Sequence, residues 1–230
     1  KKEDFGNDGM VRLTGRRAEH IVKILKSAKG DRIKCGLLNG PRGESEVIEI
    51  ENDSVLVRPE LLKSCEKPRS ITAVLAMIRP QALRRTLINL AVFGVSDIRL
   101  INSAKVEKQY FGQRLLHDDK FMECFYLGLE QGAHTLLPSL NIHRSFKVFM
   151  EEELDRCSGD NVRILAHPGE DKAVMPEENK GITVAIGPEG GWTEYEVSVF
   201  RKKGFTVIPL GNKILKTETA VPYLFGKLGI

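Results

Sequence analysis

Residues 182–196 read Ile182-Thr183-Val184-Ala185-Ile186-Gly187-Pro188-Glu189-Gly190-Gly191-Trp192-Thr193-Glu194-Tyr195-Glu196. The apolar run up to Ile186 predicts a short buried strand, and the glycines that follow predict a loop. Thr193 with Glu196 three residues later forms a capping box, so a helix is expected to begin there. A glycine-rich loop between a strand and a helix lets backbone N–H groups approach a ligand closely.

The loop matches neither of the two common nucleotide-binding patterns. It lacks the Lys-Ser/Thr ending of a Walker loop, and its glycine spacing is not that of a dinucleotide-binding fingerprint. Glu189 within the loop disfavours a phosphate and favours a neutral or cationic ligand. Taken alone, the loop is equally compatible with a tight turn that binds nothing.

Two further strand ends lead into unusual loops. The strand that ends at Leu210 is followed by a loop in which Leu210, Ile214 and Leu215 flank polar residues, and this apolar slot would suit a purine ring. Thr219 is expected to cap the last helix, with Pro222 in its first turn. His167, after the strand Val162–Ala166, could act as a base, but a lone loop histidine more often only packs. Parallel α/β sheets bind ligands at the carboxyl ends of their strands.

The rest of the chain supports a two-domain organisation. Residues 1–67 contain short alternating strands and one helical stretch at Arg16–Lys26, which predicts a small β-barrel. Residues 68–230 alternate strands with helices, which predicts a parallel α/β sheet. The expected elements of this second domain are strands at Ile71–Ile78, Ser96–Ile101, Leu140–His143, Val162–Ala166, Ile182–Ile186 and Phe205–Leu210 and helices at Gln81–Phe93, Gln113–Glu130, Phe146–Arg156, Glu194–Lys203 and Thr219–Leu228.

Composition limits the classes of protein. The 230 residues carry a net charge of +4 and are 41% hydrophobic, which excludes global disorder and permits a nucleic-acid partner without requiring one. No apolar run approaches the ~18–20 residues of a membrane span, and Lys1-Lys2-Glu3-Asp4-Phe5 is not a secretory leader. The four cysteines and five histidines show no metal-ligand spacing, so no metal is expected. We expect a cytoplasmic protein with reduced thiols.

Two motifs carry a family resemblance. The run G-P-E-G-G-W-T-x-x-E, followed about twenty residues later by L-G-x-x-I-L-K-T-E-T-A, resembles the small-subunit ribosomal RNA uridine N3-methyltransferase family of the SPOUT superfamily. The segments Leu13–Leu25, Gly94–Ile98 and Glu130–Gly132 are also similar to that family.

The resemblance implies a PUA-like β-barrel domain over residues 1–67 and a SPOUT methyltransferase domain over 68–230, with a deep trefoil knot at about 160–230. It implies a homodimer, with ribosomal RNA or the small ribosomal subunit as partner and S-adenosylmethionine as cofactor. The cofactor-binding residues implied by the motifs are Leu165, Ala166, His167, Pro168, Ile186, Gly187, Pro188, Glu189, Gly190, Gly191, Leu210, Gly211, Ile214, Leu215, Thr217, Thr219 and Ala220.

Departures from the family concern the RNA side more than the cofactor loops. The family usually has Arg where this chain has Lys216, which keeps the charge but loses the planar guanidinium fork. The end of the helix after Arg79 carries Asn89 and Val92 where the family has Lys and Glu. These changes put the target nucleotide in doubt more than the chemistry.

Methylation at uridine N3 requires removal of a proton, and the methyl donor is a sulfonium cation. We expect Glu218, or else Glu189, as proton acceptor or electrostatic partner, and Lys216 as the group that stabilises charge on the uracil oxygens. Orientation of the reactants could also suffice without a dedicated base. The expected RNA-binding residues are Arg12, Arg16, Arg17, Arg32 and Arg79, with Lys23, Lys26, Arg84 and Arg85 as further candidates, although each alone could simply be solvated.

Three alternatives stay open at this point. Another SPOUT activity, at a ribose 2′-oxygen or a different base, would use the same loops. A non-catalytic RNA-binding or ribosome-assembly factor could retain the fold, although intact cofactor loops disfavour it. A phosphate-transfer enzyme is disfavoured by the missing Walker ending.

Overall fold

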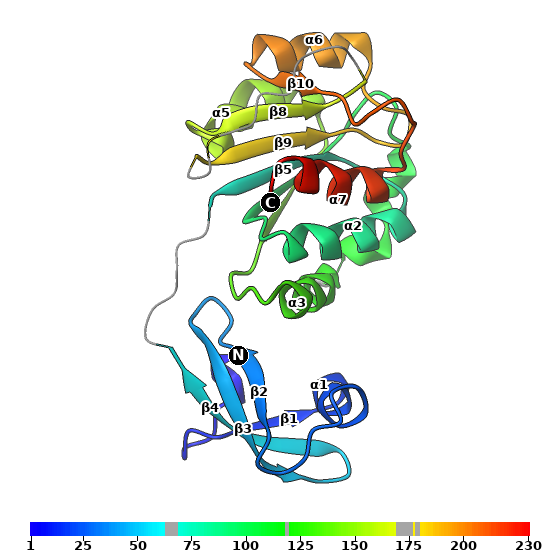
Figure 1. The fold of residues 1–230 in the computed structure, drawn as a ribbon. Helices are drawn as coiled ribbons and strands as arrows, with labels where there is room; N and C mark the ends of the chain where they lie inside the picture. Colours follow the sequence, from blue (N-terminus) through cyan, green and yellow to red (C-terminus); the bar gives the residue numbers. More distant parts are fainter. Residues whose placement is uncertain (63–68, 118–119, 169–176, 178–179) are drawn as a thin grey trace. The chain divides into compact units, whose positions relative to one another are not determined.

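The computed structural model describes residues 1–62, 69–117, 120–168, 177 and 180–230. The chain divides into two compact units (Figure 1). Unit 1 comprises Lys1–Lys67 together with Ala133–Leu136, and unit 2 comprises Pro68–Gly132 together with Leu137–Ile230.

Unit 1 is built on a four-stranded antiparallel sheet with the order β1-β4-β3-β2. Its strands are β1 (Val11–Thr14), β2 (Arg32–Gly36), β3 (Arg42–Ile50) and β4 (Ser54–Leu61). The expected helical stretch is confirmed as α1 (Arg16–Glu19) running into one π-helical turn (His20–Ile24). By strand pairing, β1 and β2 are the two edges, so closure of this sheet into a barrel stays a prediction.

The core of unit 1 is small and aliphatic. Val47 and Val55 are fully buried between the sheet and Ile21 of the π-helical turn. The segment Ala133–Leu136 joins this unit through Thr135, whose Oγ1 donates to the Gly40 carbonyl at 2.7 Å. Nothing in the local sequence predicts that addition, because the contact spans 95 residues.

Unit 2 is an α/β unit whose six-stranded sheet is parallel throughout, as predicted. The strand order is β10-β8-β9-β5-β6-β7. The strands are β5 (Ile71–Ala76), β6 (Asp97–Ile101), β7 (Ser139–His143), β8 (Val162–Ala166), β9 (Ile182–Ile186) and β10 (Thr206–Ile208). The central strands β5 and β9 are buried on both faces, which explains why their sequences are continuously apolar.

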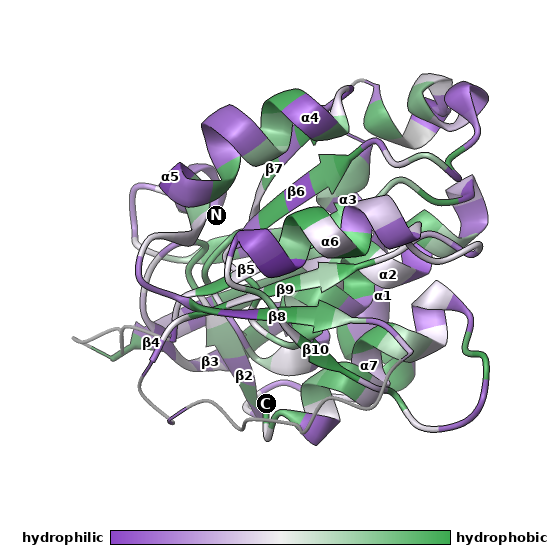
Figure 2. Ribbon diagram, turned by 90° about the horizontal axis from the view of Figure 1, so that it is seen from above, coloured by the Kyte–Doolittle hydropathy of each residue, from purple (hydrophilic) through white to green (hydrophobic). Residues whose placement is uncertain are grey.

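Helices cover both faces of this sheet (Figure 1). One face carries α2 (Pro80–Val92), α3 (Phe121–Gly132) and α7 (Thr217–Lys227). The other carries α4 (Phe146–Val148), a π-helical turn (Phe149–Glu153), α5 (Leu154–Ser158) and α6 (Glu194–Lys202). Alternate residues of β5 divide between the two cores: Ala73 and Leu75 face the α2 side, and Val74 and Ala76 face the α6 side. Figure 2 shows the strands as largely hydrophobic, whereas α6 carries both hydrophobic and hydrophilic residues.

The helix predicted over Gln113–Glu130 is wrong in its first part. Arg114–Leu116 is a short 3₁₀ turn, and α3 begins only at Phe121. Gln113 is extended, with φ −66° and ψ 140°, and is buried. Its Nε2 donates to the nearby Tyr110 carbonyl at 2.8 Å and to the distant Ile78 carbonyl at 3.4 Å, and these contacts go with the extended backbone at Gln113.

The predicted start of the last helix is also wrong. Lys216, not Thr219, is the N-cap of α7, because its carbonyl accepts from the backbone N–H of Ala220 at 2.8 Å. The buried Thr217 is therefore the first helical residue. Pro222 consequently lies inside the helix rather than in its first turn.

Candidate functional site at the carboxyl edge of the sheet

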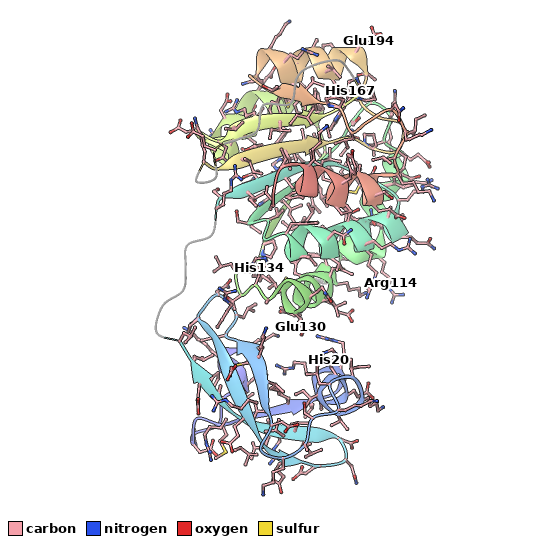
Figure 3. All side chains as sticks on the ribbon, in the orientation of Figure 1. His20, Arg114, Glu130, His134, His167 and Glu194 are labelled. Carbon is pink, nitrogen blue, oxygen red and sulfur yellow. The ribbon has the colours of Figure 1, made fainter. Side chains whose placement is uncertain are left out.

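The three unusual loops follow β8, β9 and β10, which are adjacent in the sheet. Because these strands are parallel, the loops leave from one edge. The backbone N–H of His167 donates to the Ile208 carbonyl at 3.4 Å, and Thr217 Oγ1 donates to the Gly187 carbonyl at 3.2 Å. Figure 3 shows His167 at the same end of the sheet as Glu194, the first residue of α6. The fold thus brings together the three loops that the sequence singled out.

The glycine loop is a tight turn anchored in the core. The N–H of Gly191 donates to the Pro188 carbonyl at 2.8 Å, and Gly191 has φ +66°, a backbone region that favours glycine. The next residue, Trp192, is 3% exposed and packs edge-on against Phe200 with ring centroids 4.9 Å apart. This anchor fixes the end of the loop to the core of unit 2.

Buried polar atoms without a hydrogen-bond partner in the described part of the chain include two beside these loops. They are Trp192 Nε1 and His167 Nδ1. Burial, together with the charges of Arg201 and Lys105, lowers the pKa of His167 and so favours its neutral ring. A buried polar atom without a partner is costly, and a bound ligand with polar edges could satisfy both.

The two candidate acids are each paired with an arginine of α2: its N-cap Arg79, and Arg85 further along the helix. Arg79 Nε lies 3.1 Å from Glu189 Oε1, and this hydrogen bond raises the pKa of Arg79. Arg85 Nη1 lies 3.1 Å from Glu218 Oε1. The side chains of Glu189 and Glu218 are 26% and 20% exposed. Each carboxylate therefore keeps one oxygen, Oε2, outside the ion pair.

The residues of the third loop differ widely in exposure. Thr217 and Ala220 are buried, Leu210 and Leu215 are partly buried, and Lys216 is exposed. Gly211 adopts φ +84°, which favours glycine at this bend.

Ile214 and Thr219 are exposed, and Ile214 is 100% exposed. Ile214 therefore lines no apolar slot within the described chain.

The remaining predicted cofactor residues lie at the strand ends. Leu165, Ile186 and Pro188 are buried, Ala166, His167 and Gly187 are partly buried, and Pro168 and Gly190 are exposed.

The arginines predicted to bind RNA mostly have carboxylate partners. The pairs are Arg12 with Glu51, Arg17 with Asp4, Arg32 with Glu44 and Glu60, and Arg79 with Glu189. Arg16 is exposed. Ion pairs between exposed side chains contribute little to stability, so an RNA phosphate can replace the carboxylate partners of Arg12 and Arg32 at small cost.

Two residues of this edge, Lys105 and Glu196, escaped the sequence prediction as site residues. Lys105 lies 85 residues from Gly190, whose carbonyl it contacts at 2.8 Å. Arg85 was an RNA-binding candidate, but its pairing with Glu218, 133 residues away, was not predicted. Glu196 was predicted only as part of the capping box, yet its Oε1 also accepts from the Ala104 N–H at 2.8 Å. Such long-range contacts leave no local signal in one sequence.

The described residues contain neither a metal-binding cluster nor a membrane-spanning helix. No group of three or more His, Cys, Asp or Glu side chains there could hold a metal ion. None of the helices described combines the length and the apolar character needed to cross a membrane.

Two family models match the chain consecutively. Residues 13–60 match an RNA methyltransferase PUA domain, and residues 65–229 match an RNA methyltransferase domain.

Among named relatives, the ribosomal RNA small subunit methyltransferase E of Treponema pallidum is 30% identical over 214 residues, which cover 87% of this chain and 77% of the relative. The ribosomal RNA small subunit methyltransferase E 1 of Borreliella burgdorferi is 29% identical over 217 residues, which cover 91% of this chain and 88% of the relative.

A solved structure shows a similar fold. The ribosomal RNA small subunit methyltransferase E of Neisseria gonorrhoeae, bound to S-adenosyl methionine, superimposes with a TM-score of 0.72 at 20% identity, covering 95% of this chain and 90% of that one. At this identity the likeness supports the fold alone.

Proposed function

The chain belongs to the RNA methyltransferase family, and from that premise we propose that it uses S-adenosylmethionine to methylate N3 of a uridine in 16S ribosomal RNA of the small subunit. Family membership carries the methyltransferase activity. The named relatives are ribosomal RNA small subunit methyltransferases, which supports the choice of substrate. Such a substrate would place the protein in the cytoplasm.

One observation carries this proposal furthest. The two motifs that resemble the uridine N3-methyltransferases follow β9 and β10, the two neighbours of β8 in the parallel sheet, and are joined by the hydrogen bond from Thr217 Oγ1 to the Gly187 carbonyl. Residues that are thirty positions apart in the sequence therefore lie side by side. A carboxyl strand edge of this kind is where α/β sheets bind ligands.

The residues present fit S-adenosylmethionine. Trp192 Nε1 and His167 Nδ1 are buried without partners among the described residues, and a purine with an amino acid tail offers polar atoms for both. A Cβ on residue 187 would lie 3.2 Å from Trp192 Nε1, so glycine at this position leaves the indole N–H accessible to a ligand. We propose that the loops around His167, Gly190 and Leu215 hold the cofactor.

When bound, the cofactor supplies a methyl group on a positively charged sulfur. Glu218 Oε1 is held by Arg85, and its Oε2 is left to accept the N3 proton of the uridine. Lys216 is the N-cap of α7, where a cation is unfavourable for the helix dipole. Its position is therefore not explained by helix stability, and we assign it to charge stabilisation on the uracil oxygens. Glu189 contributes a further negative charge beside the glycine loop.

A deep trefoil knot over residues 160–230 is part of this proposal. The chain passes from β9 through α6 to β10, on the far side of β8. It then returns to α7, which packs in the same core as α2 on the opposite face from α6. This path supports threading of the last segment through the preceding loops.

A homodimer is also proposed, with the site near its interface. Ile214 is fully exposed and Tyr223 of α7 is 50% exposed, although both lie beside the proposed cofactor loops. Burial against a second copy would remove this apolar surface from water. Light scattering on the purified protein tests this proposal, because a monomeric mass at micromolar concentration would contradict it.

The activity is tested by incubating the protein with small ribosomal subunits or 16S RNA and labelled S-adenosylmethionine. We expect one labelled 3-methyluridine, identified by nucleoside mass spectrometry and located by an arrest of reverse transcription. Lys216→Ala and Glu218→Gln should lower kcat with unchanged cofactor affinity. Label at a ribose oxygen or another base would contradict the proposed position, and full activity of both variants would contradict the residue roles.

A further inference from the structure

Lys105 lies on the glycine loop although it comes from the segment after β6. Its Nζ donates to the Gly190 carbonyl at 2.8 Å. Its stem follows the loop closely, since a Cβ on Gly190 would lie 3.1 Å from Lys105 Cδ and 3.3 Å from Lys105 Cβ. The side chain is thus held along its length rather than only at its tip.

A buried carboxylate holds the backbone that carries this lysine. Glu196 is 2% exposed, and its Oε1 accepts from the N–H of Ala104, the residue before Lys105, at 2.8 Å. Glu196 Oε2 accepts from the N–H of Thr193 at 2.8 Å and from its hydroxyl at 2.9 Å. One side chain therefore fastens the segment after β6 to the start of α6, where the glycine loop ends.

The charge of Lys105 has no carboxylate partner among the residues that the structure describes. Its one hydrogen bond there goes to a neutral carbonyl, and the residue is exposed. Arg79 and Arg85 differ, because Glu189 and Glu218 balance their charges. An ammonium group has three N–H donors, so two stay available for an anion.

We propose that Lys105 binds a non-bridging phosphate oxygen of the RNA next to the target nucleotide, and that Glu196 is the positioning residue that places it. This inference rests on the proposed function. The anion is an oxyanion of a substrate, and the exposed ammonium beside the glycine loop favours the polyanionic RNA over the cofactor's own carboxylate. The charge of Lys105 also acts on His167, which places it beside the loop after β8 as well.

The test is Lys105→Met, which keeps most of the stem and removes the charge. Binding of 16S RNA is measured by filter retention at several salt concentrations, and cofactor binding by calorimetry. Losing one phosphate contact should reduce the slope of log K against log salt by about 0.7–0.9 and leave the cofactor Kd unchanged. Lys105→Arg should restore the slope, because a guanidinium also binds phosphate.

Lys202→Met is the matched control. Lys202 is also exposed, but it lies at the end of α6, away from the glycine loop. The salt dependence of RNA binding by Lys202→Met should therefore equal that of the wild type. An unchanged slope for Lys105→Met would overturn the inference. Weaker cofactor binding with an unchanged slope would also overturn it, by assigning Lys105 to the cofactor carboxylate. Failure of the proposed function would show separately, as a wild-type protein that transfers no methyl group to RNA.

Discussion

Glu196→Ala should destabilise unit 2 more than its single position in a surface helix suggests. The substitution removes the acceptor for three donors: the N–H and hydroxyl of Thr193 and the N–H of Ala104. Loss of the capping interaction costs about 1 kcal/mol. Leaving the Ala104 N–H without its charged acceptor costs about 2 kcal/mol more. The expected loss is therefore about 3 kcal/mol.

Calorimetric thermal unfolding measures this loss directly. At about 2–4 °C per kcal/mol for a unit of this size, the Tm should fall by roughly 6–12 °C. Glu194→Ala is the matched control, because Glu194 lies in the same first turn of α6 but is exposed. Its substitution should change stability by about 0.5 kcal/mol or less. Equal Tm losses for the two variants would refute the bridging role of Glu196.

Two further predictions concern packing and pH. Gly128→Ala should lower the Tm of unit 2 by several degrees, because the new Cβ would lie 2.4 Å from the Ile88 carbonyl oxygen and 2.5 Å from Ala91 Cβ. An unchanged Tm would contradict this close packing of α2 and α3. Arg17 binds both oxygens of Asp4, at 2.7 and 2.9 Å, and holds the pKa of that carboxyl well below its usual range. The pair therefore stabilises the fold at pH values above the unfolded pKa of about 4, and this stabilisation is lost as the pH falls through the folded pKa. Asp4→Asn should lower the free energy of unfolding by about 1 kcal/mol at pH 7 and by progressively less at acid pH, as measured by unfolding curves. A difference between variant and wild type that stays constant with pH would contradict this prediction.

The parallel sheet was predictable because its strands leave strong local signals. Val162–Ala166 and Ile182–Ile186 are buried apolar runs, and both are strands with the predicted bounds. The capping box at Thr193 is equally local and is confirmed. In contrast, the first part of the predicted Gln113–Glu130 helix is wrong, because the buried Gln113 side chain bonds to the Ile78 carbonyl 35 residues away, a tertiary contact that periodicity does not encode.

The sequence predicted which loops form the candidate site, but it did not predict the side-chain contacts between them. Adjacent parallel strands must bring their following loops to one edge, so the neighbourhood of His167 and Gly187 follows from topology. The pairing of Glu218 with Arg85 and the placement of Lys105 on Gly190 depend on side chains that are 133 and 85 residues apart. A single sequence does not show which of its distant residues come into contact.

Cofactor binding at the three loops is the central claim, and calorimetric titration with S-adenosylmethionine tests it most directly. The wild type should bind about one molecule per chain. Gly190→Trp should abolish binding, because a Cβ there already lies 3.1 Å from Lys105 Cδ and the indole must displace the glycine loop proposed to hold the cofactor. Gly112→Trp should bind normally, because nothing lies within 4 Å of a Cβ at Gly112. Folded wild-type protein that binds no S-adenosylmethionine, or a Gly190→Trp variant that binds it as well as the Gly112→Trp control, would contradict the proposed site.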